Sequence, residues 1–310
     1  MNRSMFSLAD LLTVLASIGF GFFCFLSFNF LTMGETNKSI LLAVAIALIL
    51  GGLAFGATLL KRTNRNFKTC IICEWVLLFL FVIAAIFAIK PFSHYFVVSQ
   101  HKEDIQKELI ANINQAEGMY NDYKNYADNR LKIYESKLNS IVMAKRTNPA
   151  EYLEYEFEEG IDDKIQIDNK LFTLKAKLYP SNFKDIANDN VKWIDEAKST
   201  VNSWKPIGLV GVINDVEKNL TSWKTDLANY SRFRAKGEVA DDFEYSLSFN
   251  DVKGRMTQLG RPNWIAVLCA IGLYFLMLIS YLVTRRHPCY PGLKLLLGIE
   301  SKDNSIDHVL

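Results

Sequence analysis

Four stretches of about 20 residues carry almost no charged side chain: Leu11–Leu31, Ile40–Leu60, Cys70–Ile89 and Trp264–Thr284. A helix of that length crosses the roughly 30 Å hydrocarbon core of a bilayer. Charged residues still make up 22% of the chain, close to the soluble average, so the apolar excess is concentrated in these stretches. The sequence therefore predicts a membrane protein with four transmembrane helices, and it excludes a purely soluble or disordered chain.

Basic residues beside these stretches predict the orientation. Residues 61–68 read KRTNRNFK, with four basic residues and no acidic one, and Arg285 and Arg286 follow the fourth stretch. Arg3 precedes the first stretch. Lysine and arginine in short flanking loops favour the cytoplasmic side of a membrane. These flanks share one side only if both termini are cytoplasmic and residues 91–262 are extracytoplasmic.

The predicted organisation follows from this orientation. Residues 1–90 hold three transmembrane helices at about 11–31, 40–60 and 70–89, residues 91–262 form an extracytoplasmic domain, residues 263–285 hold the fourth helix, and residues 286–310 form a short cytoplasmic tail. All five cysteines lie in or near the apolar stretches. A domain as long as 91–262 folds without disulfides. This cysteine usage is typical of a bacterial inner (cytoplasmic) membrane protein with a periplasmic domain.

The charge of residues 91–262 excludes one class of partner. This region contains 24 basic and 27 acidic side chains, a net charge of −3. Nucleic-acid binding needs a clustered basic face, which such a mixture does not provide. The expected partners are the lipid bilayer, another membrane or extracytoplasmic protein, or a second copy of the chain.

Residues 102–146 predict one long helix, because they contain no proline and a single glycine. Their apolar residues recur at steps of three or four, the spacing of a coiled coil or an antiparallel helix pair. These residues are Leu109, Ile113, Ala116, Tyr120, Tyr123, Ala127, Leu131, Tyr134, Leu138 and Ile141. Pro91 predicts an end or a kink of the preceding transmembrane helix. The fold class is therefore mainly α, with an elongated, mostly helical domain between the third and fourth transmembrane helices.

The rest of this domain leaves alternatives open. Residues 165–179 fit a short hairpin or a helix, and residues 243–249 alternate like a short strand or an extended segment. Residues 183–235 predict two helices divided near Pro206. Trp204 and Trp223 occur in similar five-residue segments, and they belong either to one shared core or to a ligand-stacking site.

An acidic stretch runs from Glu151 to Asp163 and contains seven carboxylates. It predicts either a cation site, a docking surface for a basic partner, or a solvated helix face. The D-x-D-x-D-G pattern of an EF-hand loop is absent from it.

Small residues mark one face of the second apolar stretch. Ala43, Ala47 and Gly51 recur every four residues, and Gly52 and Gly56 form a GxxxG pair. Small side chains let helix backbones approach closely in lipid. The face predicts either an interface between copies or packing within one four-helix bundle.

A metal site is one interpretation of the cysteines. Cys70 and Cys73 lie one helical turn apart, and His287 and Cys289 follow the fourth stretch at the same predicted cytoplasmic level. Zn²⁺ takes four such ligands. A CxxC without a second one is also consistent with unrelated interfacial cysteines.

Glu74 is a charged residue inside the third apolar stretch, and such a residue is a candidate functional site. The alternative is an ion pair with Lys68 or Arg65 at the membrane surface. A proton or ion pathway needs several such residues, so an ion-coupled transporter is not expected.

No motif predicts chemistry. The sequence lacks G-x-S-x-G, H-E-x-x-H, Walker A and G-x-G-x-x-G patterns, so neither an enzyme nor a cofactor is expected. The predicted layout resembles tetraspanins in topology, and Asn29 and Glu74 resemble the polar residues of their helices. The large loop lacks their CCG signature, so the resemblance is one of topology.

Two functions fit these observations. The first is a non-enzymatic membrane scaffold, or an accessory or sensor subunit, that presents its helical domain to a partner or to another copy. The second is a subunit of an oligomeric channel or pore, for which the first stretch offers the polar residues Thr13, Ser17, Ser27 and Asn29.

Overall fold

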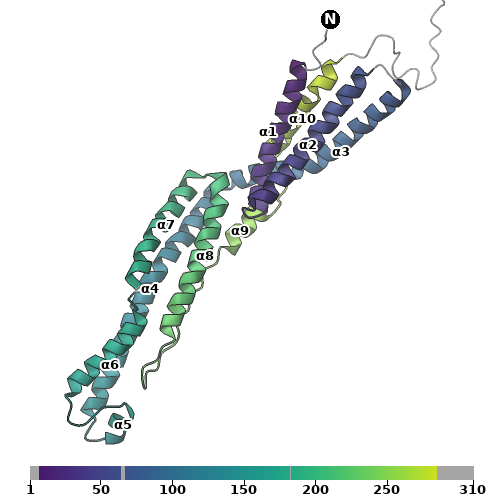
Figure 1. The fold of residues 1–310 in the computed structure, drawn as a ribbon. Helices are drawn as coiled ribbons and strands as arrows, with labels where there is room; N and C mark the ends of the chain where they lie inside the picture. Colours follow the sequence, from purple (N-terminus) through teal and green to yellow (C-terminus); the bar gives the residue numbers. More distant parts are fainter. Residues whose placement is uncertain (1–6, 64–66, 182, 285–310) are drawn as a thin grey trace, which may run out of the picture. The chain divides into compact units, whose positions relative to one another are not determined.

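The computed structural model describes residues 7–63, 67–181 and 183–284, and these residues are mainly helical and contain no strand. The chain divides into two compact units (Figure 1). The helical unit is Lys102–Arg255, and the transmembrane unit comprises Met1–His101 and Met256–Leu310. Each unit is described by itself.

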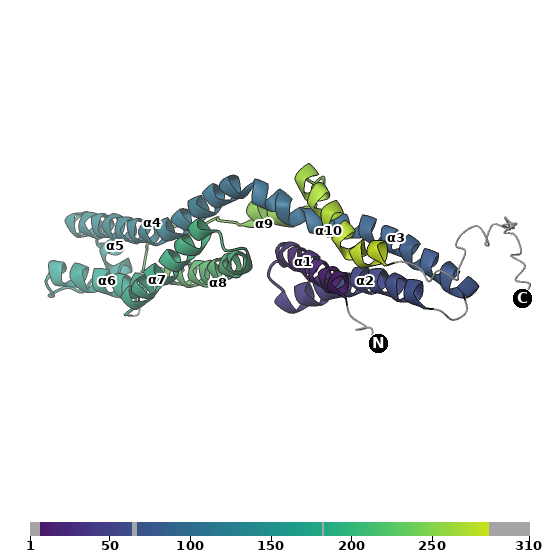
Figure 2. The same cartoon turned by 90° about the horizontal axis from the view of Figure 1, so that it is seen from above.

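Four helices of the transmembrane unit are long and apolar enough to cross a membrane. They are α1 (Leu8–Leu31), α2 (Thr36–Arg62), α3 (Phe67–Gln100) and α10 (Trp264–Val283), and Figures 1 and 2 show them side by side. The prediction of a mainly helical chain with four helices long and apolar enough to cross a membrane is confirmed.

Local sequence explains where two of these helices begin. Ser7 and Asp10 form a capping box at the start of α1, in which each side chain bonds the backbone N–H of the other residue. The Asn263 side chain accepts from the Ile265 N–H at 2.8 Å and caps α10.

The interior of this four-helix bundle combines small and aromatic side chains. Phe20 of α1 stacks on Phe92 of α3 with ring centroids 4.6 Å apart, and Tyr274 of α10 lies 5.2 Å from Phe20. The opposite faces are apolar and exposed, for example Phe79 at 66% and Phe87 at 75%. Such outward faces are stable in lipid, where apolar side chains need no protein cover.

The third span does not end at Pro91, because α3 continues to Gln100. The residues after the proline are anchored in the transmembrane unit. Phe92 is fully buried against Phe20, and the His94 Nε2 atom lies 2.8 Å from the Met256 carbonyl oxygen. These contacts outweigh the loss of one backbone hydrogen bond at the proline.

The helical unit is built around α4 (Lys102–Met143), which contacts every other long helix of the unit. The others are α5 (Pro149–Glu154), α6 (Asp163–Leu178), α7 (Phe183–Ser203) and α8 (Pro206–Ser231). Residues 232–249 have no regular secondary structure, and α9 (Asn250–Thr257) follows them. Residues 165–179, which fit either a hairpin or a helix by sequence, fall mainly in α6.

The buried face of α4 follows the expected three- and four-residue steps, but it differs from the prediction at two positions. Met119 and Arg130 are buried in place of the predicted Tyr120 and Leu131, and the latter two are half-buried. The complete buried set is Ile105, Leu109, Ile113, Ala116, Met119, Tyr123, Ala127, Arg130, Tyr134, Leu138 and Ile141.

The two tryptophans of the repeated segments are buried. Trp204 is 9% exposed and Trp223 is 7% exposed, and Trp223 lies 5.0 Å from the ring of Trp193. Residues 243–249 form no strand, but their exposure still alternates, with Phe243 and Phe249 buried. Of the two alternatives for these residues, an extended segment agrees with this pattern.

Candidate functional site

A buried carboxylate joins three spans at one end of the transmembrane unit. Asp10 of α1 is 0% exposed and accepts from Arg62 of α2, at 3.0 Å from Nη1 and 2.8 Å from Nη2. It also accepts from the Ser280 hydroxyl of α10 and, at 2.8 Å, from the Ser7 backbone N–H. Such charge-assisted bonds compensate for the removal of the carboxylate from water.

Glu74 brings α3 into the same end of the bundle. Its side chain is 1% exposed, and the Tyr281 hydroxyl donates to its Oε1 atom at 2.5 Å. Lys61 of α2 donates to the Tyr281 carbonyl oxygen at 2.7 Å and lies 4.2 Å from the centre of the tyrosine ring. The side chains of Lys68 and Arg65, the alternative partners of Glu74, lie outside the described part of the chain.

These two sets of contacts form one polar cluster, defined by Asp10, Lys61, Arg62, Glu74, Ser280 and Tyr281. Charges inside a membrane protein mark either a transport path or a structural tie. Here the contacts run between helices at one level instead of along a span. The cluster therefore has the form of a clamp that holds α1, α2, α3 and α10 together.

Three of the predicted helix-packing residues pack α2 against α1 of the same chain. Ala43 is 4% exposed, and a Cβ added to Gly21 of α1 would lie 2.9 Å from the Ala47 Cβ. A Cβ on Gly51 would lie 2.7 Å from the Ser17 Oγ. These three small residues therefore allow close approach of α1 and α2 within one bundle.

The GxxxG pair faces elsewhere. A Cβ added to Gly56 would lie 3.2 Å from the Leu77 Cδ1 of α3. A Cβ added to Gly52 would meet no described atom within 4 Å, and Gly52 is exposed. Of the five predicted packing residues, Gly52 is the one that faces open space.

Of the four predicted metal ligands, Cys70 and Cys73 lie among the described residues. Cys70 is half-buried and Cys73 is exposed, and both are free thiols. His287 and Cys289 lie outside the described residues. In the described part of the chain, no group of three or more His, Cys, Asp or Glu side chains is placed to hold a metal ion.

The polar residues of α1 point into the bundle. The Thr13 hydroxyl donates to the Met277 carbonyl oxygen at 2.9 Å, and the Ser17 hydroxyl donates to the Thr13 carbonyl oxygen at 2.8 Å. Ser27 is 0% exposed and Asn29 is 2% exposed. These side chains therefore contribute to packing between the helices of one chain.

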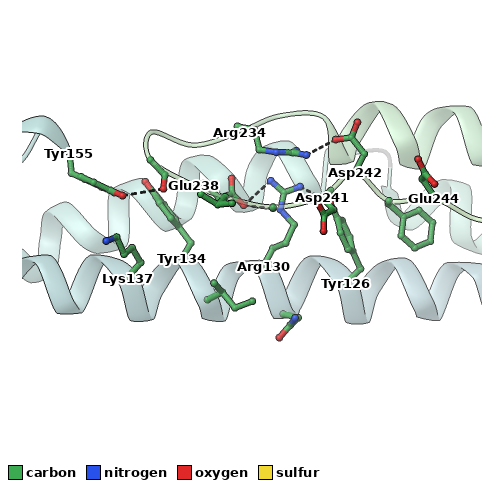
Figure 3. A pocket seen from close by; sticks show the side chains of 16 residues that line it. Tyr126, Arg130, Tyr134, Lys137, Tyr155, Arg234, Glu238, Asp241, Asp242 and Glu244 are labelled. Atoms are coloured by element: carbon green, nitrogen blue, oxygen red, sulfur yellow. Dashed lines mark hydrogen bonds and ion pairs between the residues drawn. The ribbon is translucent and has the colours of Figure 1, made fainter. Parts of the chain in front are cut away.

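In the helical unit, a groove of about 1280 Å³ runs along α4 (Figure 3). One wall consists of α4 residues between Tyr126 and Lys137, and the other consists of residues 237–244 of the irregular segment. Tyr155 and Arg234 complete the lining. The groove therefore contains aromatic, basic and acidic side chains together.

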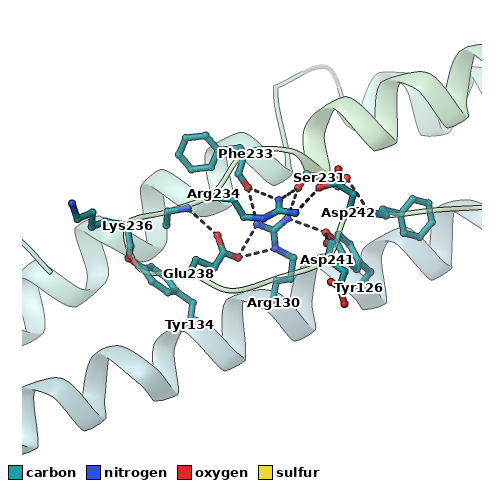
Figure 4. Close-up of polar contacts among 12 residues, drawn as sticks. Tyr126, Arg130, Tyr134, Ser231, Phe233, Arg234, Lys236, Glu238, Asp241 and Asp242 are labelled. Atoms are coloured by element: carbon teal, nitrogen blue, oxygen red, sulfur yellow. Dashed lines mark hydrogen bonds and ion pairs between the residues drawn. The ribbon is translucent and has the colours of Figure 1, made fainter. Parts of the chain in front are cut away.

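Arg130 fixes the shape of this groove (Figure 4). Its Nε donates to the Glu238 carboxylate at 2.7 Å, and its Nη1 donates to the Ser231 carbonyl oxygen at 2.7 Å and to the Tyr126 hydroxyl at 3.0 Å. Its Nη2 donates to the Phe233 carbonyl oxygen at 2.7 Å. Burial lowers the pKa of Arg130, but the hydrogen bond and charge of Glu238 outweigh it, so the pKa of the guanidinium is raised. Arg130 therefore stays charged and ties the irregular segment to α4.

Tyrosines hold the same segment at three further points. Tyr126 donates to the Asp241 carbonyl oxygen at 2.5 Å, Tyr134 to that of Lys236 at 3.2 Å, and Tyr155 to that of Gly237 at 3.1 Å. Gly237 has a φ of +69°, and an added Cβ would lie within 2.4 Å of the Tyr155 ring, so glycine is required there.

The acidic stretch forms helix caps and ion pairs. The Asp162 side chain caps α6 by accepting from the N–H groups of Lys164 and Ile165. Glu151 pairs with Lys137 at 2.9 Å. Asp163 accepts from the Tyr152 hydroxyl at 2.5 Å. These roles agree with the solvated-face interpretation and do not assemble a cation site among the described residues.

No family model matches the chain, and no curated protein or solved structure matches it. The candidate sites therefore rest on the geometry given above.

Asp10, Arg130 and Glu238 are among the residues of the candidate sites that are not predicted from sequence. Asp10 falls outside the predicted first span because the uncharged run begins at Leu11, while α1 begins at Leu8. Arg130 falls outside the predicted α4 seam because that seam consists of apolar residues, although Arg130 lies three residues after Ala127 and four before Tyr134. Glu238 has no local signal, since its partner lies 108 positions away in the chain.

Proposed function

We propose that this chain is a non-enzymatic integral membrane scaffold or accessory subunit. It presents the helical unit outside the cytoplasm to another membrane or extracytoplasmic protein, or to a second copy. The supporting observation is that Lys102–Arg255 forms a compact unit, which the chain enters after the apolar helix α3 and leaves before the apolar helix α10. Because both ends of this unit continue into apolar helices, the membrane holds the unit in place, and its surface is available to a partner beside the membrane.

The charge flanks support the orientation in this proposal. The basic segment 61–68 and the pair Arg285 and Arg286 favour a cytoplasmic position for both termini. The absence of cysteine from residues 91–262 is the reason for proposing the inner membrane of a bacterium. Three apolar helices precede residues 91–262, so a cytoplasmic N-terminus implies that this region lies on the other side of the membrane.

The alternative of an oligomeric pore has less support. A water-filled path between subunits needs polar side chains on an outward helix face. The polar residues of α1 instead face the other helices of the same bundle, where Thr13 and Ser17 bond carbonyl oxygens.

A topology experiment tests the proposal. A reporter fused after Leu310 should be active in the cytoplasm, and a reporter inserted near Asn148, in the exposed turn between α4 and α5, should be active outside it. If both reporters are active on the same side, the proposed presentation of the helical unit is wrong. If the reporters are active on opposite sides, as expected, cross-linking mass spectrometry on intact membranes should locate protein contacts of the helical unit.

A further inference from the structure

We propose that the groove along α4 in the helical unit binds an extended segment of a partner protein that carries lysine or arginine residues between apolar ones. This inference rests on the proposed function and names the chemistry of the partner. It follows from the charges, the apolar side chains and the backbone of the groove.

The basic side chains that line the groove are already neutralised. Each of them forms an ion pair: Arg130 with Glu238 at 2.7 Å, Arg234 with Asp242 at 2.5 Å, and Lys137 with Glu151 at 2.9 Å. They therefore contribute little net positive charge to an incoming ligand.

Two carboxylates of the lining remain without an ion pair among the described residues, namely Asp241 and Glu244. Both side chains are exposed, and Figure 3 shows them on the same irregular segment. The groove therefore has an uncompensated negative charge, which complements lysine or arginine and repels an acidic ligand.

Apolar side chains accompany these carboxylates. Ile133 on the α4 wall is 57% exposed, and Val239 on the opposite wall is 92% exposed. Lysine and arginine place their alkyl stems on such surfaces while their charged ends reach carboxylates. A segment with basic residues between apolar ones satisfies both features of the groove.

The backbone of the irregular segment favours an extended ligand. Glu238 N–H donates to the Ala235 carbonyl oxygen at 3.0 Å, and Phe243 N–H donates to the Ser231 Oγ at 2.9 Å. Among the described residues, none of the N–H groups of residues 239–242 between them has a protein acceptor. An extended peptide can pair with such an unpaired run of backbone.

Binding of a defined peptide to the full-length chain in lipid nanodiscs tests this assignment. The probe is a fluorescent eight-residue peptide of alternating lysine and valine, and the readout is fluorescence anisotropy. We expect saturable binding that weakens as salt is raised, since exposed charges are screened. The double variant Asp241→Asn with Glu244→Gln should bind roughly 10-fold more weakly, because it removes both unpaired charges.

A matched control keeps the test specific. The double variant Glu154→Gln with Glu159→Gln removes two exposed carboxylates that do not line the groove, and it should bind the peptide as the unmodified chain does. An equal loss in both double variants, or no saturable binding at millimolar peptide, would overturn the assignment. So would carbodiimide cross-links from Asp241 or Glu244 to a lysine of a second copy, because the occupant would then be another copy.

The outcome is separable from that of the topology experiment. If the reporters place the helical unit in the cytoplasm while the peptide still binds, the groove assignment holds and the proposed function fails. If the helical unit is exported and the peptide does not bind, only the groove assignment fails.

Discussion

The guanidinium of Arg130 and the carboxylate of Glu238 form an ion pair with an N–O distance of 2.7 Å, and each side chain is only 4% exposed. The pair joins α4 to a segment that has no regular secondary structure of its own. Replacing both members of a buried pair by apolar groups is often neutral, whereas removing one member leaves a buried charge without a partner. The main effect of the Arg130–Glu238 pair is therefore to fix the position of residues 232–249.

Loss of one member of this pair should destabilise the helical unit. Glu238→Gln keeps the size of the side chain but leaves the Arg130 charge uncompensated, so we expect the free energy of unfolding to fall by about 3 kcal/mol. Urea unfolding followed by circular dichroism measures the change. Glu244→Gln, on the exposed side of the same segment, should change it by less than about 0.5 kcal/mol. Equal effects of the two variants would show that the buried pair does not hold the segment.

Tyr134 should make the helical unit sensitive to alkali. Burial first, and then the Glu238 carboxylate, raises the pKa of Tyr134 from 10.0 to about 12. Because this folded-state pKa lies above that of the unfolded chain, the stabilisation is complete below pH 10 and is lost as pH rises toward about 12. The free energy of unfolding should therefore decline over this window, and less steeply in Tyr134→Phe. An identical decline in the variant would exclude Tyr134 as a cause.

The apolar spans could be predicted from sequence because length and the absence of charge define them. Two of their ends could not. The run without charge begins at Leu11, whereas the Ser7–Asp10 capping box starts α1 at Leu8, and the packing of Phe92 on Phe20 accompanies the continuation of α3 beyond Pro91. The α4 seam could be predicted from its spacing, but its charged member Arg130 requires a partner that is distant in sequence. In the irregular segment, residues 243–249 show an alternating pattern, but the position of the segment depends on contacts with α4 that are distant in sequence.

The two adjacent glycines of α2 should respond differently to leucine. At Gly51 the new side chain would meet Ser17, because a Cβ added there would lie 2.7 Å from the Ser17 Oγ. Gly51→Leu should therefore separate α1 from α2 and lower thermal stability, measured by thermal unfolding in detergent. At Gly52 there is open space among the described residues, so Gly52→Leu should leave the fold intact.

Native mass spectrometry of the same pair tests self-association. If the exposed face around Gly52 joins copies of the chain, Gly52→Leu should shift the protein toward monomer because close backbone approach is lost. Unmodified protein that is monomeric at high concentration in mild detergent would exclude the homo-oligomeric form of the scaffold. Gly51→Leu provides the contrast, since it should act on stability whatever the stoichiometry.

Within the polar cluster of the transmembrane unit, the contributions of Asp10 and Arg62 to stability should be coupled. Asp10→Asn removes the negative charge of the carboxylate that accepts hydrogen bonds from both Arg62 guanidinium nitrogens. The Arg62 side chain is 29% exposed and can regain some water, so we expect a loss of about 2 kcal/mol, below the range for a fully buried partner. Asp10→Leu combined with Arg62→Leu removes both charges and should cost less than the sum of the two single leucine variants. The cycle is measured by thermal unfolding in detergent, with exposed Glu35→Gln as the control. Additive losses would mean that the two charges act independently and that the clamp does not depend on their pairing.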